Sequence, residues 1–265
     1  MGGLRFRALG VSWRAARVFR RSFAASREAW APRLATTVLA PLLCVLAFGH
    51  GLGRAVGEVR VGEGAVPYGE FVLPGLVAAF AFAKGFHGTI RAGRGGIAGG
   101  RTLEAILTAP LTLGDAVLGE ALWRAATAAA AAAIVLAAAP AAGLAVAPRH
   151  ALALPVAAVA GFLFSSVGIL AAALVRRRES LVAAEILVGA PAILFSGALF
   201  PLDVLPGWAA ILARASPLAH VVELARAGMT GAAPPDGRWS ALYVAAAAAA
   251  LFLAALGAAR RRWAR

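Results

Sequence analysis

Residues 151–175 read ALALPVAAVAGFLFSSVGILAAALV, a long apolar run without a charged side chain. An α-helix rises about 1.5 Å per residue, so about 20 apolar residues cross a hydrocarbon core of about 30 Å. Similar runs lie on both sides of this stretch. The sequence therefore predicts six transmembrane helices, over Ala35–Gly51, Phe71–Ile90, Ala116–Ala139, Ala151–Val175, Leu181–Phe200 and Trp239–Ala259.

The overall composition agrees with a chain that lives in a bilayer. Hydrophobic residues make up 61% of the 265 positions, charged residues only 14%, and the mean hydropathy is +0.81. A soluble domain has about 45–50% apolar and about 25% charged residues, so one soluble core could not bury this excess. We expect an all-α membrane protein, without a cleaved signal peptide because no short apolar region with a cleavage site follows the basic start.

The net charge of +14 comes from arginines that gather between the apolar runs. They are not interleaved with an aromatic platform, so no nucleic-acid partner is expected. Cytoplasmic loops of membrane proteins carry an excess of Lys and Arg. The richest segments are the N-terminal one (Arg5, Arg7, Arg14, Arg17, Arg20, Arg21, Arg27, Arg33), the 2–3 loop (Arg91, Arg94, Arg101), the 4–5 turn (Arg176, Arg177, Arg178) and the tail (Arg260, Arg261, Arg262, Arg265).

The alternate connections hold fewer arginines and more acids, which places them on the opposite side of the membrane. The solution that fits is six spans with both termini in the cytoplasm, in a cytoplasmic (inner) membrane. Residues 1–34 form a cytoplasmic amphipathic segment, in which arginines alternate with apolar side chains over Leu4–Trp30, as in a helix lying on anionic lipid. Residues 35–265 form the six-span domain.

Two connections are predicted to be more than tethers. Arg101–Gly114 is typical of a short amphipathic helix on the cytoplasmic side, with Leu103, Ile106 and Leu107 on one face and Pro110 at its end. Pro201–Gly231 lies outside and is broken by Pro206 and Pro217. It predicts two short interfacial helices, with Trp208 at the level of the lipid headgroups.

Three chemistries are poorly supported. The glycine-rich run 95–102 has the outline of a phosphate-binding loop, but Arg101 stands where the lysine should be and no strand precedes it. Ser196 could serve a hydrolase only with a histidine on a facing helix, and the sixth span contains none. The four histidines lack metal-ligand spacing, and the single cysteine, Cys44, lies in an apolar run. No catalytic, metal or cofactor site is expected in this chain.

Ionisable residues at membrane depth are candidates for function because a charge there costs at least a few kcal/mol. Lys84, Glu120, Arg124 and Glu185 qualify by position. Each also has a simpler explanation. Lys84 can extend its amine to the interface, Glu120 and Arg124 are one helical turn apart and can pair, and Glu185 can face the arginines of the 4–5 turn.

Several motifs are informative when taken together. They are FVLPGL at 71–76, TLEAILTAPL at 102–111, GEALW at 119–123, FSGALFP at 195–201, LPGW at 205–208, SPLAH at 216–220, and Arg226. In this order, and over nearly the whole chain, they resemble the permease subunits of type-2 ABC exporters. The branch most resembled exports nodulation lipo-oligosaccharides and certain drugs. The extreme alanine content of the third and sixth spans departs from the family.

The resemblance implies a half-transporter. Two permease subunits would pair, and each would dock on a separately encoded ATPase that binds ATP and Mg²⁺. Docking would use the N-terminal helix and the coupling helix of the 2–3 loop, here Arg101, Thr102, Leu103, Glu104, Ile106, Leu107 and Pro110. The family's last external segment would include Phe200, Pro201, Pro206, Trp208, Pro217 and His220.

The expected function is export of an amphiphilic substrate from the cytoplasm or inner leaflet: a lipo-oligosaccharide, a lipid-linked glycan or a hydrophobic drug. The partners are the ATPase, a second copy of the chain and membrane lipids. Two alternatives stay open, a membrane-embedded enzyme that modifies lipids and a scaffold that transports nothing. A pair of acids or histidines at one membrane depth would favour the enzyme.

Overall fold

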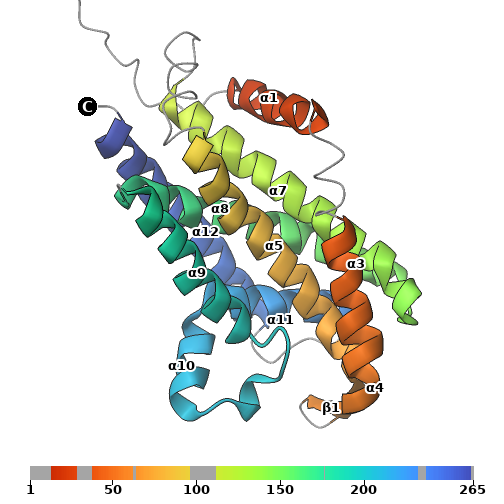
Figure 1. The fold of residues 1–265 in the computed structure, drawn as a ribbon. Coiled ribbons are helices and arrows are strands. Elements are labelled where there is room, and N and C mark those ends of the chain that lie inside the picture. Colours follow the sequence, from red (N-terminus) through yellow and green to blue (C-terminus); the bar gives the residue numbers. More distant parts are fainter. Residues whose placement is uncertain are drawn as a thin grey trace, which may run out of the picture.

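The computed structural model describes residues 13–28, 38–61, 64–95, 112–175, 177–231 and 237–263, and almost all of them are helical (Figure 1). The centre is built from α5 (Tyr68–Gly95), α7 (Leu113–Ala138), α8 (Ala153–Leu174) and α12 (Gly237–Trp263). With the short 3-10 helices that flank α7 and α8, these form the four stretches long and apolar enough to cross a membrane. The prediction of a helical membrane protein is confirmed.

The first and fifth predicted spans are shorter helices. The first runs through α3 (Ala40–Cys44), the π-helix η2 (Val45–Leu52) and α4 (Gly53–Val56), and the fifth is α9 (Arg178–Leu194). The fifth was expected to reach Phe200, but the chain turns at Gly197, whose φ of 73° favours glycine. The count of six spans therefore stays a prediction.

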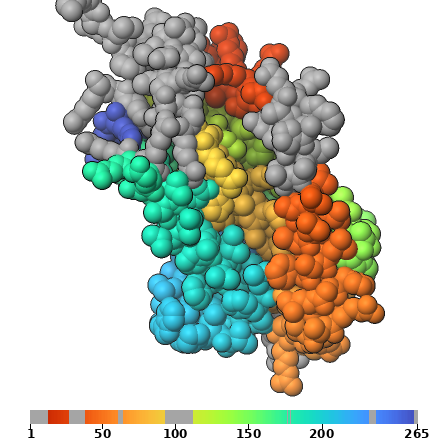
Figure 2. All heavy atoms as spheres, viewed as in Figure 1, coloured from red at the N-terminus to blue at the C-terminus, as the bar shows by residue number. Residues whose placement is uncertain are grey.

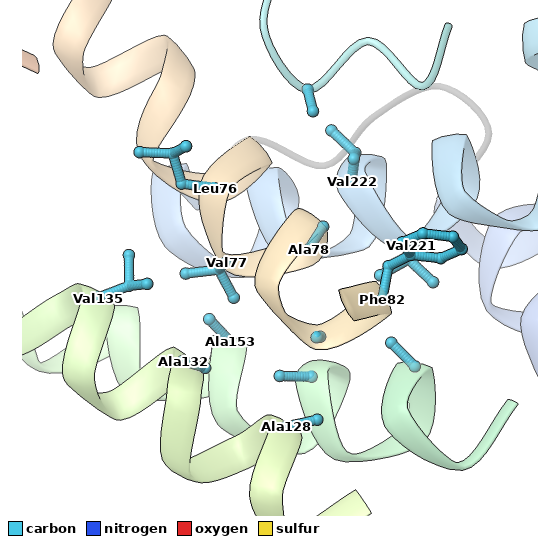
Figure 3. Packing of buried hydrophobic residues seen from close by; sticks show 14 of the residues in the cluster. Leu76, Val77, Ala78, Phe82, Ala128, Ala132, Val135, Ala153, Val221 and Val222 are labelled. Atoms are coloured by element: carbon cyan, nitrogen blue, oxygen red, sulfur yellow. The ribbon is translucent and has the colours of Figure 1, made fainter. Parts of the chain in front are cut away.

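Helix α8 lies at the centre of the packing, where small residues let backbones approach closely. A β-carbon on Gly161 would lie 2.7 Å from the Arg124 carbonyl oxygen of α7, and one on Gly85 of α5 would lie 2.8 Å from the Gly161 carbonyl oxygen. In lipid, such close packing replaces the hydrophobic drive between helices. The same core contains Phe82, Ala128 and Val221 side chains from α5, α7 and α11 (Figure 3).

The alanine-rich parts of α7 and α12 differ in burial. Ala128, Ala131 and Ala132 of α7 are fully buried. On α12, 22% of the most apolar window is buried, whereas the corresponding part of α5 is 67% buried. Alanine thus serves contact between helices on α7, while much of α12 faces outward.

A small β-hairpin, absent from the sequence prediction, follows α4. Strands β1 (Glu58–Val61) and β2 (Gly64–Pro67) pair antiparallel, with Val59 opposite Val66. The alternation of charged and apolar residues over 58–61, followed by glycine, is the signal that predicts such a strand. The hairpin lies at the end of the molecule that also holds α4 and α10 (Gly207–Ala215) (Figure 1).

The remaining elements complete the two ends. Helix α1 (Ala15–Glu28) crosses α7 near the end where the C-terminus lies, and α11 (Pro217–Thr230) crosses α5 and α8 toward the opposite end (Figure 1). Helices α10 and α11 occupy the segment for which two short helices were predicted. Three short 3-10 helices join the larger elements: η3 (Ala139–Ala142), η4 (Pro148–Leu152) and η5 (Leu202–Val204).

Candidate transport and coupling sites

One stretch of α5 makes polar contacts with two other helices, α8 and α9. His87 Nδ1 lies 3.1 Å from Glu185 Oε1 of α9, an approach outside hydrogen-bond geometry, and Arg91 Nε donates to the same oxygen at 3.3 Å. Thr89 and Ser165 of α8 share a hydrogen bond at 2.9 Å. Glu185 is thus engaged across the helix interface with α5, a partner the sequence did not predict.

Glycines make room for this arrangement on both neighbours. A β-carbon on Gly189 of α9 would collide with the His87 ring, and one on Gly88 of α5 would lie 2.8 Å from Arg124 Nη1 of α7. The two turns of α5 from Lys84 to Arg91 therefore meet α7, α8 and α9, and we call this region the polar layer. Two of the four predicted polar residues, Lys84 and Glu185, lie in it directly, and a third, Arg124, packs against it.

Glu120 and Arg124 form the pair that the simpler explanation predicted. Arg124 Nε donates to Glu120 Oε1 at 2.7 Å, and Nη2 lies 2.6 Å from the same oxygen. Both side chains are largely shielded from solvent, so the pair neutralises a charge that would be costly alone.

A furrow runs beside the polar layer. Figure 2 shows α5 recessed between α9 and the α3–α4 helix. On α9, Ile186 and Leu187 are 63% and 72% exposed, and Leu39 and Leu43 are about half exposed at the start of the first helix. Exposed apolar side chains thus lie on helices at both edges of the furrow.

Two of the sequence motifs, FVLPGL at 71–76 and FSGALFP at 195–201, meet in space. A β-carbon on Gly75 of α5 would collide with the backbone of Ala198, and the Tyr68 hydroxyl donates to the Leu199 carbonyl at 3.0 Å. The Arg226 guanidinium lies 4.3 Å from the centre of the Phe71 ring. It also donates to the Gly197 carbonyl at 3.1 Å. Burial lowers the pKa of Arg226 to about 10, and the nearby Glu223 carboxylate partly offsets this.

The predicted external segment forms one wall of a pocket of about 660 Å³. Phe200 and Pro201 line it with Asp203, opposite Phe48 of η2 and the charged edge of the hairpin, Glu58 and Arg60. Apolar and charged residues together line this pocket, a combination that suits an amphiphile. Trp208 is 63% exposed, whereas Pro217 begins α11.

His220 belongs to a polar cluster that the sequence did not predict, because its partner is a serine on a distant helix. His220 Nδ1 lies 2.9 Å from Ser240 Oγ of α12, Ser240 donates to Glu223 Oε2 at 2.6 Å, and Nε2 donates to the Arg214 carbonyl at 3.0 Å. We call His220, Glu223 and Ser240 the external cluster.

The external cluster is not arranged for nucleophilic catalysis. In a working triad the acid orients the histidine, whereas here it contacts the serine, and Ser240 is fully buried. The Ser196 hydroxyl donates to the carbonyl of Ile193, three residues before it, at 2.8 Å. Within the described residues, no three His, Cys, Asp or Glu side chains gather as a metal site would require.

The predicted coupling residues 101–110 lie outside the residues that the structure describes. The start of α7, which follows them, is stabilised by a capping box in which Thr112 and Asp115 exchange hydrogen bonds at 3.0 and 3.1 Å. Helix α1 packs on this part of α7. Phe19 and Phe23 meet the Trp123 ring edge-on, with ring centres 5.5 and 6.1 Å apart.

A bundle of long apolar helices, joined by a polar layer and bearing exposed apolar side chains, defines a multi-pass membrane protein. Comparison with known families identifies which one. Residues 13–230 match the ABC-2 type transporter model, and the chain belongs to that family. It is a transport subunit, and the resemblance seen in the motifs is confirmed.

The chain is also similar to proteins named Nodulation protein J. It is 38% identical to that of Rhizobium leguminosarum bv. trifolii over 214 residues, 81% of this chain and 80% of the relative. For Sinorhizobium fredii the identity is 34% over 82% of this chain and 81% of the relative. For Rhizobium leguminosarum bv. viciae it is 35% over 87% of each.

Proposed function

We propose that this chain is the permease subunit of an ATP-driven exporter of the inner membrane, and that it moves an amphiphilic substrate out of the cytoplasm or inner leaflet. The substrate is a lipo-oligosaccharide, a lipid-linked glycan or a hydrophobic drug. The proposal is supported by family membership and by the Nodulation protein J relatives. In this proposal α3 to α4 and α9 complete six crossings with both termini inside.

The observation that carries the proposal is the convergence of elements at one end of the bundle. Helix α1, the end of α5, the start of α7 and the end of α12 lie toward the same end (Figure 1). Helix α5 ends and α7 begins at this end, which also holds α1. Arg260, Arg261 and Arg262 lie in the last turn of α12, so this end offers basic side chains near the amphipathic helix α1. An ATPase subunit that binds ATP and Mg²⁺ would dock on it.

The transport route in this proposal is the furrow, and the charged side chains of the polar layer would contact the polar part of the substrate there. A substrate that carries both a polar head and apolar chains needs both kinds of surface, and exposed apolar side chains lie on helices at both edges of the furrow. Intramembrane charges usually mark substrate pathways. Pairing of Glu185 with Arg91 would compensate one positive charge of the layer until substrate groups exchange with it.

A second copy of the chain would close the furrow. Apolar side chains of α9 are exposed, among them Val182, Ile186, Leu187 and Val188, and a paired copy would bury them. The working unit is then two permeases with two ATPases. Co-purification with the ATPase followed by native mass spectrometry tests this: a two-plus-two complex is expected. Export by a single chain without an ATPase would contradict it.

A further inference from the structure

The external cluster has three contacts at hydrogen-bond distance, one more than a neutral histidine, a serine and an ionised glutamate have protons to fill. Three contacts need three protons: His220 to Arg214, His220 to Ser240, and Ser240 to Glu223. The Arg214 carbonyl can only accept, so Nε2 carries a proton. A neutral imidazole, a hydroxyl and an ionised carboxylate supply two protons in total. For all three contacts to be hydrogen bonds at once, a third proton is needed, either on Nδ1 or on the Glu223 carboxyl.

We propose that the external cluster is a proton-binding site, which takes up one proton and thereby joins α10, α11 and α12. With the proton on Nδ1, the imidazolium donates to Ser240 and Ser240 donates to a carboxylate 3.8 Å from the ring. With the proton on Glu223, the acid donates to Ser240 and Ser240 donates to Nδ1. Both arrangements make all three hydrogen bonds, and either differs from the deprotonated cluster by one proton.

The geometry explains why the loss of this proton weakens the junction. Ser240 is fully buried, and the His220 and Glu223 side chains are 15% and 32% exposed. When the proton leaves, Ser240 can donate to His220 or to Glu223 but not to both. One acceptor is then left facing the serine oxygen without a hydrogen between them, which is costly where water is scarce.

Few other charges act on the site directly. Tyr243 of α12 stacks on the imidazole with ring centres 4.3 Å apart, and its hydroxyl donates to the Ala215 carbonyl at 2.8 Å. Helix α8 carries no titratable side chain. The remaining titratable or charged groups on this part of the elements packed against α11 are Arg214 on α10, Arg226 on α11, Arg238 on α12, Arg149 and His150 on η4, and Tyr68 and Glu70 on α5.

The sign of the pH effect follows from the proton count. All three hydrogen bonds form only when the cluster holds the extra proton, so the junction is tighter at low pH and loosens as pH rises. The inference adds a pH response to the outer end of the proposed exporter. Its test uses neither ATP nor transport, so its failure and that of the proposed function are distinguishable.

Glu223→Gln is the informative variant because an amide reproduces the protonated acid. Its NH₂ group donates to Ser240 at every pH, which lets Ser240 donate to a neutral His220. Melting temperatures of the purified full chain in lipid nanodiscs would be compared at about pH 5.5 and about pH 8.5, on either side of the imidazole range. We expect wild type to match Glu223→Gln at low pH and to fall about 2–4 °C below it at high pH.

Two further measurements make the test decisive. His50→Gln, at an exposed histidine on η2, should keep the wild-type pH response, because it lies outside the cluster. Nuclear magnetic resonance of ¹⁵N-histidine, assigned with His220→Gln, reports the protonation of both ring nitrogens directly in the wild-type chain. Equal gaps between wild type and Glu223→Gln at both pH values, or a neutral His220 beside an ionised Glu223 at low pH, would overturn the proposal.

Discussion

Gly75 of α5 packs directly on the backbone of Ala198, so closely that a β-carbon at position 75 would overlap the Ala198 carbonyl. The contact joins the start of a long apolar helix to the turn that follows α9. Two hydrogen bonds to the same turn reinforce this contact. The Tyr68 hydroxyl donates to the Leu199 carbonyl, and the Arg226 guanidinium donates to the Gly197 carbonyl. Two motifs far apart in the sequence thus form a single structural unit.

The first prediction concerns this contact. Gly75→Ala should destabilise the chain by about 1–3 kcal/mol, because overpacking forces backbone shifts where no flexible side chain can yield. Thermal unfolding in detergent, followed by tryptophan fluorescence, measures the change. Gly257→Ala on α12 is the matched control, since a β-carbon there meets nothing within 4 Å. Equal melting temperatures for the two variants would refute the close packing.

Arg226 gives a second prediction. Arg226→Gln removes the interaction with the Phe71 ring and the charge-assisted bond to the Gly197 carbonyl. A loss of about 1–2 kcal/mol of stability is expected, less than the two contacts would give separately, because burial already opposes the charge. Chemical unfolding curves provide the measurement. Arg214→Gln, at an exposed position, should change little, and a similar effect from both would argue against a specific role for Arg226.

The polar layer gives the third prediction. Glu185→Gln keeps the shape of the side chain but removes the charge that faces His87 and Arg91. We expect folding and ATPase binding to persist while substrate-stimulated ATP hydrolysis falls several-fold, since the layer then carries uncompensated positive charge. Glu179→Gln, in the exposed first turn of α9, serves as the control. Normal stimulation in Glu185→Gln would remove the polar layer from the transport route.

The fourth prediction tests the coupling segment. Leu107→Asp and Glu104→Arg should weaken binding of the ATPase and uncouple hydrolysis from transport, while membrane insertion stays intact because the spans are untouched. Pull-down of the ATPase and transport assays give the two readouts. Val204→Asp, at an exposed position toward the opposite end, should leave ATPase binding unchanged. Unaltered coupling in the first two variants would favour a helix that merely lies on lipid.

The sequence predicted what depends on long apolar runs and on charge, and missed what depends on contacts between distant residues. The helices at 151–175 and 71–90 could be read directly, because lipid demands continuous apolar length. The early end of α9 depends on one left-handed glycine, Gly197. The joining of His220 to Ser240 depends on how α11 crosses α12, for which no local pattern exists.

The polar residues illustrate the same division. Glu120 and Arg124 are neighbours on one helix, so their pairing follows from spacing alone and is confirmed. The sequence suggested the nearby arginines of the 4–5 turn as partners of Glu185. Its carboxylate instead reaches α5, because Gly189 leaves space for the His87 ring. A helix-to-helix partner of this kind requires knowledge of which faces meet.

The most direct test of the account is reconstitution of this chain in liposomes together with a candidate ATPase subunit. The account predicts that ATP hydrolysis depends on both chains, rises when a lipo-oligosaccharide or another amphiphile is added, and drives that substrate across the bilayer. Hydrolysis that no amphiphile stimulates, with no substrate moved by the two-chain complex, would contradict it.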